Sequence, residues 1–363
     1  MIVRDEQDNV QRCFKSIQHL IDAYAIVDTG SNDSTIDVVK FHAQNHRIPG
    51  KIISTPWKDF GTNRTGALHH AGNVIEGLDP KLQNNWYLFF IDADDQAIGI
   101  KINKRSLTLD QYLMETRSGN IAYQNVRFVK WNPDQPWIWR QRRHEYIAPL
   151  GNWSPTQGEI QTGYILRGTE GLRSRNRHTS LEDALELLKQ FSEEPENSRA
   201  VFYAAQSFRD AGYPDLAQQM YRRRIEMGGW HQEIYQSLLY LGCRNLFQGD
   251  LGPETVNFFL QAFEKCPQRL EAPFYLLRIW RLQEQYKIGW NFAKPLLDLA
   301  PASDSLFLDR EIHDWGFWEE AGLCAYYAGD KAAFKKLLNR ILRAKDLPQD
   351  VRTRTRNNLK TFA

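Results

Sequence analysis

The pattern of apolar and polar residues divides the chain into two halves of different character. From residue 1 to about residue 178, short apolar runs alternate with segments that are apolar at every third or fourth position. The short runs predict buried strands, and the wider spacing predicts helices that are apolar on one face. A β-α-β-α order is typical of a mostly parallel sheet. We therefore expect an α/β domain over residues 1–178.

The strands expected in this domain are short, and the helices between them have one apolar stripe each. Strands are expected over residues 2–3, 25–27, 51–54, 87–91, 119–131 and 159–166, and helices over 9–20, 34–41 and 65–75. The segment 131–155 is rich in Trp, Pro and Arg, which predicts a long functional loop.

From about residue 180 the pattern is helical throughout. Helix pairs are expected at 232–248 with 253–265, 270–285 with 287–299, and 315–328 with 331–344, with a last helix at 349–361. Pairs that recur at roughly 31 to 45 residues resemble tetratricopeptide repeats, which stack helical hairpins into a curved surface. We expect residues 179–363 to form such an all-α repeat domain. Its surface is suited to a protein or peptide acceptor, or to formation of a homo-oligomer.

Composition and charge narrow the class of protein. Hydrophobic residues make up 42% of the 363 positions, and the net charge is +2, so no bulk attraction to nucleic acid or anionic membranes is expected. The four cysteines match no zinc or redox spacing, which favours buried thiols and a reducing compartment. They are Cys13, Cys243, Cys266 and Cys324. The charged start of the chain lacks a signal-peptide pattern, and the longest apolar run, Trp86 to Ile91, is too short for a transmembrane segment. These features predict a cytoplasmic protein.

Acidic residues follow two of the expected strands. Asp28 ends one apolar run, and Asp92 and Asp94 follow another. Ligands of open α/β sheets bind at the carboxyl ends of the strands. Alternate carboxylates such as Asp92 and Asp94 can share one hard cation, Mg²⁺ or Mn²⁺, that would also bind a diphosphate. The alternative interpretation is a solvated turn, since a lone Asp-x-Asp pattern arises often by chance.

Other polar residues are expected at the same edge of the sheet. Asp28 could accept a hydrogen bond from a base or a ribose, and Arg4 and Glu6 lie just past the first expected strand. Asn63 and Arg64 could reach the nucleotide or its phosphates. The structural alternatives are a turn for Asp28, exposed charges for Arg4 and Glu6, and helix capping with packing for Asn63 and Arg64.

Together these segments resemble a family 2 glycosyltransferase of the GT-A fold. The segments that carry the resemblance are Met1 to Glu6, Ile26 to Thr35, Trp57 to Arg64 and Phe90 to Asp95. The resemblance covers roughly residues 1 to 178. The helical half is similar to the repeat domain that follows such catalytic domains in one branch of the family, through the stretch Arg199 to Gly212.

The resemblance implies transfer of a sugar from a nucleotide sugar, usually UDP-linked, with inversion at the anomeric carbon. Carried over to this chain, it implies that Asp94 is the main metal ligand and that Asp92 contacts the ribose or the metal. The donor site would comprise Arg4, Glu6, Asp28, Thr29, Asn63, Arg64 and Asp92. His178, after the basic run at 173–177, could add a metal ligand, and a solvated linker is the alternative.

Inversion requires a base that takes the proton of the acceptor hydroxyl. The resemblance implies that Glu145, in a His-Glu pair about fifty residues after the acidic turn, is this base. An ion pair of Glu145 with a neighbouring arginine is the structural alternative, and Asp134 and Glu159 are weaker candidates. Flat apolar faces of Trp131, Trp137 and Trp139 are suited either to sugar rings or to a core.

Two departures from the family bear on the nucleoside pocket. The chain begins almost inside its first strand, and Asp5 stands where the family commonly has Asn. Two other functions remain open at this stage. One is another nucleotide-sugar enzyme, such as a nucleotidylyltransferase, although residues 1–20 contain no glycine for its phosphate loop. The other is a non-catalytic nucleotide-binding repeat scaffold. The sugar and the acceptor, whether protein, peptide or glycan, are not specified by the sequence.

Overall fold

The computed structural model describes residues 1–81, 85–168, 178–300 and 306–362. It divides into two compact units. The first contains Met1–Gly119, Tyr123–Pro195 and Gln206–Tyr213, and the second contains Asn120–Ala122, Glu196–Ala205 and Pro214–Ala363. An α/β part with a parallel sheet is followed by a helical part, which confirms the predicted fold class.

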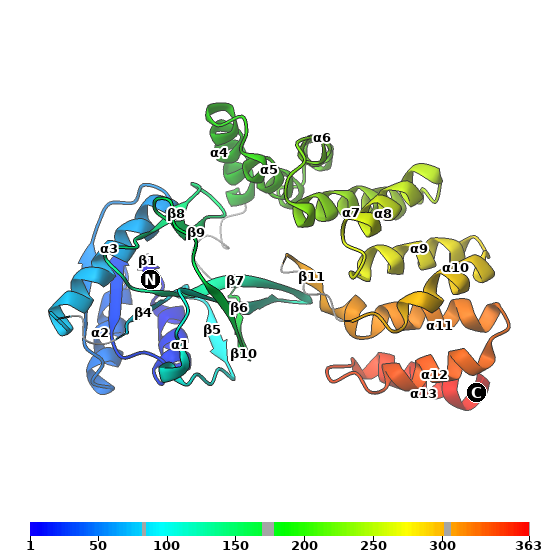
Figure 1. The fold of residues 1–363 in the computed structure, drawn as a ribbon, viewed down its shortest axis with the longest axis horizontal. Helices are drawn as coiled ribbons and strands as arrows, with labels where there is room; N and C mark the ends of the chain where they lie inside the picture. The colour runs from blue at the N-terminus through cyan, green and yellow to red at the C-terminus, as the bar shows by residue number, and fades with distance from the viewer. Residues whose placement is uncertain (82–84, 169–177, 301–305, 363) are drawn as a thin grey trace. The chain divides into compact units, whose positions relative to one another are not determined.

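A three-stranded parallel sheet forms the start of the first unit (Figure 1). Its strands are β1 (Ile2–Val3), β2 (Tyr24–Asp28) and β3 (Gly50–Ser54), and β2 pairs with both neighbours. The helices are α1 (Gln7–Ile17), α2 (Thr35–Asn45) and α3 (Phe60–Leu78). Because parallel strands need crossover connections, the predicted β-α-β-α order produces this sheet.

One small core holds the helices to this sheet. Val10 and Phe14 of α1 are buried against Val3 and Ile26 of the strands. Val39 of α2 joins the same core. The apolar stripe predicted over residues 9–20 is therefore the buried face of α1.

The remaining strands of the first unit lie mostly in a mixed sheet. They are β4 (Tyr87–Phe89), β5 (Gln96–Ile98), β6 (Gln111–Ser118), β7 (Ile121–Lys130) and β10 (Gln157–Leu166), with a 3₁₀ turn η1 (Lys104–Ser106) between β5 and β6. β4 pairs antiparallel with β7, β5 pairs antiparallel with β10, and β6 pairs in parallel with β10. The strands predicted over 119–131 and 159–166 are confirmed as β7 and β10. β5 and β6 were not predicted.

The segment 131–155 contains a hairpin, so its prediction as a loop throughout is wrong. β8 (Trp137–Arg140) and β9 (Tyr146–Pro149) pair antiparallel. Trp137 is buried in a core with Leu68 and Ile147. Trp137 is therefore a packing residue, because its ring lies in the core and is not available to a sugar.

Helix α4 (Thr179–Glu193) belongs to the first unit in the structure, whereas the sequence predicts the domain boundary at residue 178. Arg142 donates hydrogen bonds to Glu186 at 3.2 Å and to Glu193 at 2.6 Å. Arg143 forms an ion pair with Asp183 at 3.0 Å. These charge pairs join α4 to the β8–β9 hairpin.

The second unit is built mainly from helices that pair as predicted (Figure 1). The helices are α5 (Ser198–Asp210), α6 (Pro214–Glu226), α7 (His231–Phe247), α8 (Pro253–Lys265), α9 (Glu271–Leu282), α10 (Tyr286–Ala293), α11 (Phe317–Tyr327), α12 (Lys331–Ile341) and α13 (Gln349–Phe362). The last residues of α5, from Gln206, group with the first unit. The unit also contains a 3₁₀ turn η3 (Lys294–Leu296), a π turn η4 (Ile312–Gly316) and a short strand β11 (Leu308–Asp309). β11 pairs with Ile121 and Ala122 of β7. Small residues such as Gly289 and Ala293 allow these helices to approach closely.

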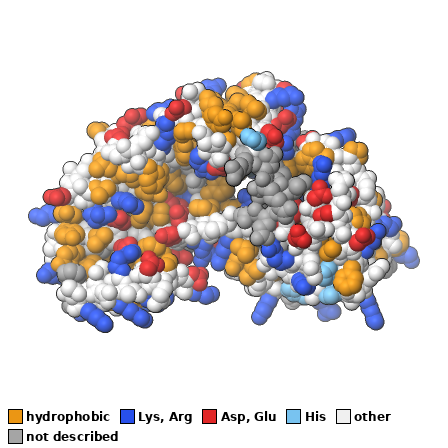
Figure 2. Space-filling view, turned by 180° about the vertical axis from the view of Figure 1, so that it is seen from behind, with side chains coloured by type: hydrophobic (Ala, Val, Ile, Leu, Met, Phe, Trp, Pro, Cys, Tyr) orange, Lys and Arg blue, Asp and Glu red, His pale blue; other side chains and the backbone are white. Residues whose placement is uncertain are grey.

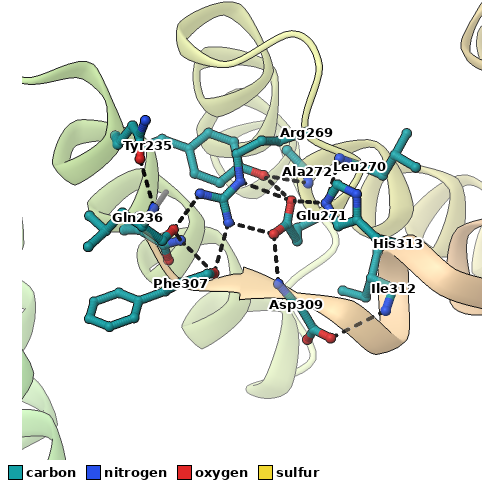
Figure 3. Close-up of polar contacts among 12 residues, drawn as sticks. Tyr235, Gln236, Arg269, Leu270, Glu271, Ala272, Phe307, Asp309, Ile312 and His313 are labelled. Carbon is teal, nitrogen blue, oxygen red and sulfur yellow. Dashed lines mark hydrogen bonds and ion pairs between the residues drawn. The ribbon is translucent and has the colours of Figure 1, made fainter. Parts of the chain in front are cut away.

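A buried polar cluster links α7, α9, the π turn η4 and β11 in this unit (Figure 3). Arg269 donates to both carboxylate oxygens of Glu271, at 3.2 and 2.5 Å. His313 Nε2 lies 3.0 Å from Glu271 Oε2, and Tyr235 donates to the same oxygen at 3.1 Å. The Asp309 amide also donates to Glu271. The charge of Glu271 is therefore fully partnered although its side chain is 1% exposed.

Two further features concern the cysteine thiols and the molecular surface. Cys13, Cys266 and Cys324 are buried, and among the described residues no disulfide joins the four cysteines. Figure 2 shows hydrophobic side chains in several groups on one face, with Lys and Arg among them. In the part of the chain that the structure describes, no helix combines the length and hydropathy that crossing a membrane requires.

Candidate functional site

Arg64 connects the two acidic residues that the sequence places far apart. It lies in the first turns of α3, and its Nη2 donates to Asp92 Oδ1 at 2.7 Å. Its Nε donates to Glu145 Oε1 at 2.6 Å. The side chains of Arg64 and Glu145 are 14% and 12% exposed, whereas Asp92 is 42% exposed. The structure therefore brings together the predicted donor-site arginine, the predicted Asp of the acidic turn and the predicted base.

Trp139 of β8 completes the surroundings of Arg64. The guanidinium carbon lies 5.1 Å from the centre of the indole ring, within the range of a cation–π interaction. The charge of Arg64 also acts on Asp92. Burial alone would raise the pKa of the Asp92 carboxyl, but Arg64 outweighs it and holds the pKa below its usual range.

Asp95 stabilises the acidic turn, a role that the sequence analysis did not predict. The Asp95 amide donates to the Asp92 carbonyl at 3.1 Å, closing the turn. The buried Asp95 carboxylate accepts from the Gly168 amide at 3.2 Å and pairs with Arg127 at 3.5 Å. Burial, followed by the nearby charge of Asp92, raises the pKa of Asp95 to about 6. The third acid in the Asp-Ala-Asp-Asp run is the signal that could have revealed this support.

The carboxylates of the turn fit a hard cation only in part. Asp92 and Asp94 are both partly exposed, and a cation that also binds diphosphate oxygens needs only one or two protein carboxylates. His178 is exposed and precedes α4. No group of three or more His, Cys, Asp and Glu side chains suited to a metal is gathered among the described residues. The predicted ligand set of Asp92, Asp94 and His178 is therefore not assembled, and the two acids of the turn are the part that fits. The basic run 173–177 lies outside the described residues.

Asp28 and Thr29 stabilise the turn after β2. The Asp28 carboxylate accepts from the amides of Gly30 at 3.3 Å and Ser31 at 3.1 Å. Thr29 Oγ1 donates to the Val3 carbonyl at 3.1 Å. Gly30 has a φ of +105°, which disfavours any residue with a side chain. These contacts match the structural alternative for Asp28, and its predicted contact with a base stays a prediction.

The nearby loop after β1 has its own constraints. Asp5 has a φ of +52°, a region that Asn and Asp tolerate better than other side chains. The Asp5 carboxylate accepts from the Asn32 amide at 2.7 Å. Glu6 accepts from Asn9 at 2.7 Å, and Arg4 is 47% exposed. The exchange of Asn for Asp at position 5 is therefore compatible with the backbone.

Asn63 is a packing residue in this structure. Its side chain is buried, its Oδ1 accepts from the Lys58 amide at 2.9 Å, and its Nδ2 donates to the Pro56 carbonyl at 3.1 Å. Both ends of the amide thus hold the loop before α3. Asp59 caps that helix by accepting from the Thr62 amide. The structural alternative for Asn63 is the one that the contacts match.

The weaker candidates for the base are both exposed. Asp134 lies in the turn before β8, and Glu159 lies on β10. Trp131 packs against Gly72 of α3, where an added methyl would come within 2.4 Å of the indole. Of the three tryptophans weighed for a sugar ring, Trp139 is the one beside Arg64.

Comparison with known proteins finds similarity to a family over the first part of the chain and to a curated protein over most of it. Residues 1–156 match the family described as Glycosyl transferase family 2. A TPR repeat-containing protein from Synechococcus elongatus is 24% identical over 327 residues, which cover 83% of this chain and 75% of that protein.

Solved structures are similar to about half of the chain. The Cut9 complex with Hcn1 has a TM-score of 0.37 and 17% identity, and the match covers 49% of this chain and 33% of the Cut9–Hcn1 chain. MamA has a TM-score of 0.36 and 12% identity over 48% of this chain and 95% of its own. Residues 1–156 are thus similar to glycosyl transferase family 2, and a helical region follows them in a chain that is similar to a TPR repeat-containing protein.

Proposed function

We propose that this protein is an inverting, metal-dependent glycosyltransferase that moves a sugar from a UDP-sugar to an acceptor hydroxyl. The observation that carries the proposal is the cluster of Asp92, Arg64 and Glu145 within a family 2 glycosyltransferase domain. Glu145, a carboxylate that can act as a base, binds the same arginine as Asp92 of the acidic turn, which is suited to a metal-bound diphosphate.

Glu145 has the chemistry that inversion requires. Its hydrogen bond from the charged Arg64 goes to a carboxylate, the form that accepts a proton. In the proposed step Glu145 takes the proton of the acceptor hydroxyl as the acceptor oxygen bonds to the anomeric carbon. The bond from that carbon to the diphosphate breaks on the opposite face, and its electron pair leaves with UDP.

Arg64 and the acidic turn would manage the charge of the diphosphate. Asp94 and Asp92 would hold Mg²⁺ or Mn²⁺, which supplies positive charge to the leaving diphosphate. The guanidinium of Arg64 has several donors and already binds both Asp92 and Glu145. It could therefore donate to a phosphate oxygen in place of one of these carboxylates. Arg4, Glu6 and Asp28 lie around the turns after β1 and β2 and would line the nucleoside pocket.

The helical region is proposed to present the acceptor. Helical repeats build extended surfaces that suit a protein or peptide, and the acceptor hydroxyl would then lie on a side chain or on a glycan attached to it. Large apolar side chains such as Phe247, Ile288 and Tyr327 are exposed on its helices. These side chains are suited to contact with such a partner or with a second copy of the chain.

The test is hydrolysis of a panel of UDP- and GDP-sugars by the full chain, with and without Mn²⁺. We expect metal-dependent release of UDP from one donor and loss of this release in Asp94→Ala. Asp37→Ala is the matched control, because Asp37 is an exposed acid on α2. Without any hydrolysis, calorimetry with UDP and Mn²⁺ decides the outcome. Binding would point to a missing acceptor, and absence of binding would contradict the proposal and favour a non-catalytic scaffold.

A further inference from the structure

The charge of this chain is unevenly distributed along its sequence. The stretch from Lys331 to Ala363 contains ten Lys and Arg residues but only two Asp, a net charge of +8. Since the whole chain carries +2, the residues before Lys331 together carry −6. The small net charge of the chain therefore conceals one strongly basic part.

The cations of this part lie on the outer faces of α12 and α13, which pack against each other (Figure 1). Apolar residues such as Phe334 and Val351 face the core of the unit. Arg352, Arg356 and Lys360 recur at every fourth position of α13, so they form a row with about 6 Å between neighbours. Nine of the ten cations are exposed, namely Lys331, Lys335, Lys336, Arg340, Arg343, Lys345, Arg354, Arg356 and Lys360.

Few neighbouring acids neutralise these cations. Arg354 forms an ion pair with Glu319 of α11 at 2.8 Å. Four of the exposed cations form no ion pair with any carboxylate that the structure describes, namely Lys336, Arg343, Arg356 and Lys360. Like charges on successive turns of a helix repel one another, so the arrangement costs stability in the absence of an anionic partner.

A solvated helix face is the simpler explanation, but such a face needs polar residues and not one sign of charge. The exposed side of α8, for example, carries Glu254 and Glu264 together with Lys265. Burial under a further helix does not fit either, because the helices of this unit contact one another through small and apolar residues such as Ala321 and Ala325. The excess of Lys and Arg therefore favours a surface for an anionic partner.

The composition of the surface argues against a protein partner and against a nucleic acid. Protein interfaces are rich in aromatic residues and poor in Lys at their centre, and single-stranded nucleic acids stack on exposed aromatic rings. Among the described side chains of α12 and α13, no large apolar or aromatic one is exposed. A helix that enters the groove of a duplex contacts it through its N-terminal residues. Asp330 caps α12 and Asp350 lies in the first turn of α13, where either carboxylate would meet phosphates.

An anionic bilayer requires none of these missing features. Its surface is a plane of negative charge that attracts clusters of Lys and Arg, and each basic side chain adds to the attraction. We propose that α12 and α13 form a basic membrane-contact surface, which adsorbs the protein reversibly on bilayers that contain anionic lipids. Lys and Arg side chains reach the headgroups, and no part of the two helices enters the hydrocarbon region. This proposal does not depend on the glycosyltransferase function.

The experiment is sedimentation of the full chain with lipid vesicles. Vesicles of phosphatidylcholine alone are compared with vesicles in which about a third of the lipid is phosphatidylglycerol. We expect binding to the anionic vesicles alone, and we expect this binding to weaken as the salt concentration rises from about 0.1 M to about 0.5 M.

Two variants with the same change in net charge locate the surface. In the first, affinity for the anionic vesicles should fall by at least about 100-fold, because four cations leave the surface. It combines Lys336→Gln, Arg343→Gln, Arg356→Gln and Lys360→Gln. The second removes four exposed lysines of the first unit and should keep the affinity of the wild type. It combines Lys15→Gln, Lys40→Gln, Lys51→Gln and Lys101→Gln. Circular dichroism of both variants checks that the helices are intact.

Several outcomes would overturn the proposal. Unchanged binding of the first variant would place the contact elsewhere, and an equal loss in both variants would make net charge the cause. Binding to neutral vesicles, or binding that resists salt, would mean that apolar groups make the contact. A DNA duplex of about 20 base pairs is tested at the same salt concentration. Tighter binding of this duplex than of the anionic vesicles, lost in the first variant, would assign the surface to nucleic acid.

Discussion

Arg64 and Glu145 are 81 residues apart in the sequence and form an ion pair of 2.6 Å in the fold. The same guanidinium binds Asp92 on its other side. Because both Arg64 and Glu145 are largely buried, removing Arg64 takes this partner from Glu145, whereas removing the charge of Glu145 leaves Arg64 paired with Asp92 alone. The ion pair therefore contributes to stability as well as to the proposed chemistry, and the two contributions can be separated by experiment.

The stability contribution is measured by a double-mutant cycle. We expect Arg64→Met to lower the free energy of unfolding by about 3 kcal/mol, since it leaves Glu145 buried without its partner. Arg64→Met combined with Glu145→Gln should cost less than the sum of the single changes, by about 1 to 3 kcal/mol. Urea unfolding of the four proteins measures this difference. Strict additivity would mean that the ion pair does not couple the two residues.

The catalytic contribution is measured with Glu145→Gln. The amide keeps the shape of the side chain and can still accept from Arg64, but it cannot take a proton. We expect the rate of sugar transfer to fall by about 10²- to 10⁴-fold, with the affinity for UDP and Mn²⁺ unchanged. Glu159→Gln, at an exposed acid on β10, should keep full activity. The reverse pattern would make Glu159 the base.

The alternating elements of the first half could be predicted from sequence because each has a simple period. The stripe of α1 and the apolar run of β2 each bury one continuous surface, and the structure confirms both. The strands β5 and β6 were missed because apolar and polar residues in them do not form a clear run. β8 was missed because Trp, Pro and Arg crowd the segment, although Trp137 packs in a core.

The candidate site shows a similar limit. Asp92 could be selected from its place after an expected strand, and Arg64 from its place at the start of a helix. The groups that they bind could not be predicted, because the hydrogen bonds from Arg64 to Asp92 and to Glu145 join residues that lie 28 and 81 positions apart in the sequence. Asn63 shows the same limit. A polar residue in the first turn of a helix can serve a ligand or the local loop; the contacts of Asn63 hold the loop before α3, and its role at a donor stays a prediction.

Two glycines in α3 are predicted to respond oppositely to alanine. Gly66 is exposed, and an added methyl there meets nothing within 4 Å, so Gly66→Ala should raise the free energy of unfolding by about 0.5 to 1 kcal/mol. Gly72 is buried, and its added methyl would lie 2.4 Å from Trp131. Gly72→Ala should therefore destabilise by about 1 to 3 kcal/mol. Denaturant unfolding of both variants tests this, and a stabilised Gly72→Ala would mean that Trp131 is free to move.

The lowered pKa of the buried Glu271 leads us to expect that the stability of the fold depends on pH. Burial alone would raise the pKa of Glu271, but Arg269 and then His313 outweigh it and hold the pKa well below its usual range. Since the pKa is lower in the folded state than in the unfolded chain, the ionised carboxylate stabilises the fold above the unfolded pKa of about 4.3. This contribution is lost as the pH falls below that value. Wild-type stability should therefore fall on acidification.

The variant Glu271→Gln isolates this contribution. At pH 7 it leaves Arg269 buried without a counter-charge, so we expect the free energy of unfolding to fall by about 3 to 5 kcal/mol. The deficit relative to wild type should shrink between pH 5 and about pH 3, because Glu271 is then progressively protonated in the unfolded chain while it stays ionised in the fold. Glu254→Gln is the control, since Glu254 is 61% exposed in its pair with Arg222 and should change stability by less than about 0.5 kcal/mol. Urea unfolding followed by the circular dichroism of the helices measures both variants at each pH. A deficit that is equal at pH 7 and pH 3 would show that Glu271 acts through its shape and hydrogen bonds, and that its charge does not set the acid sensitivity of the repeat unit.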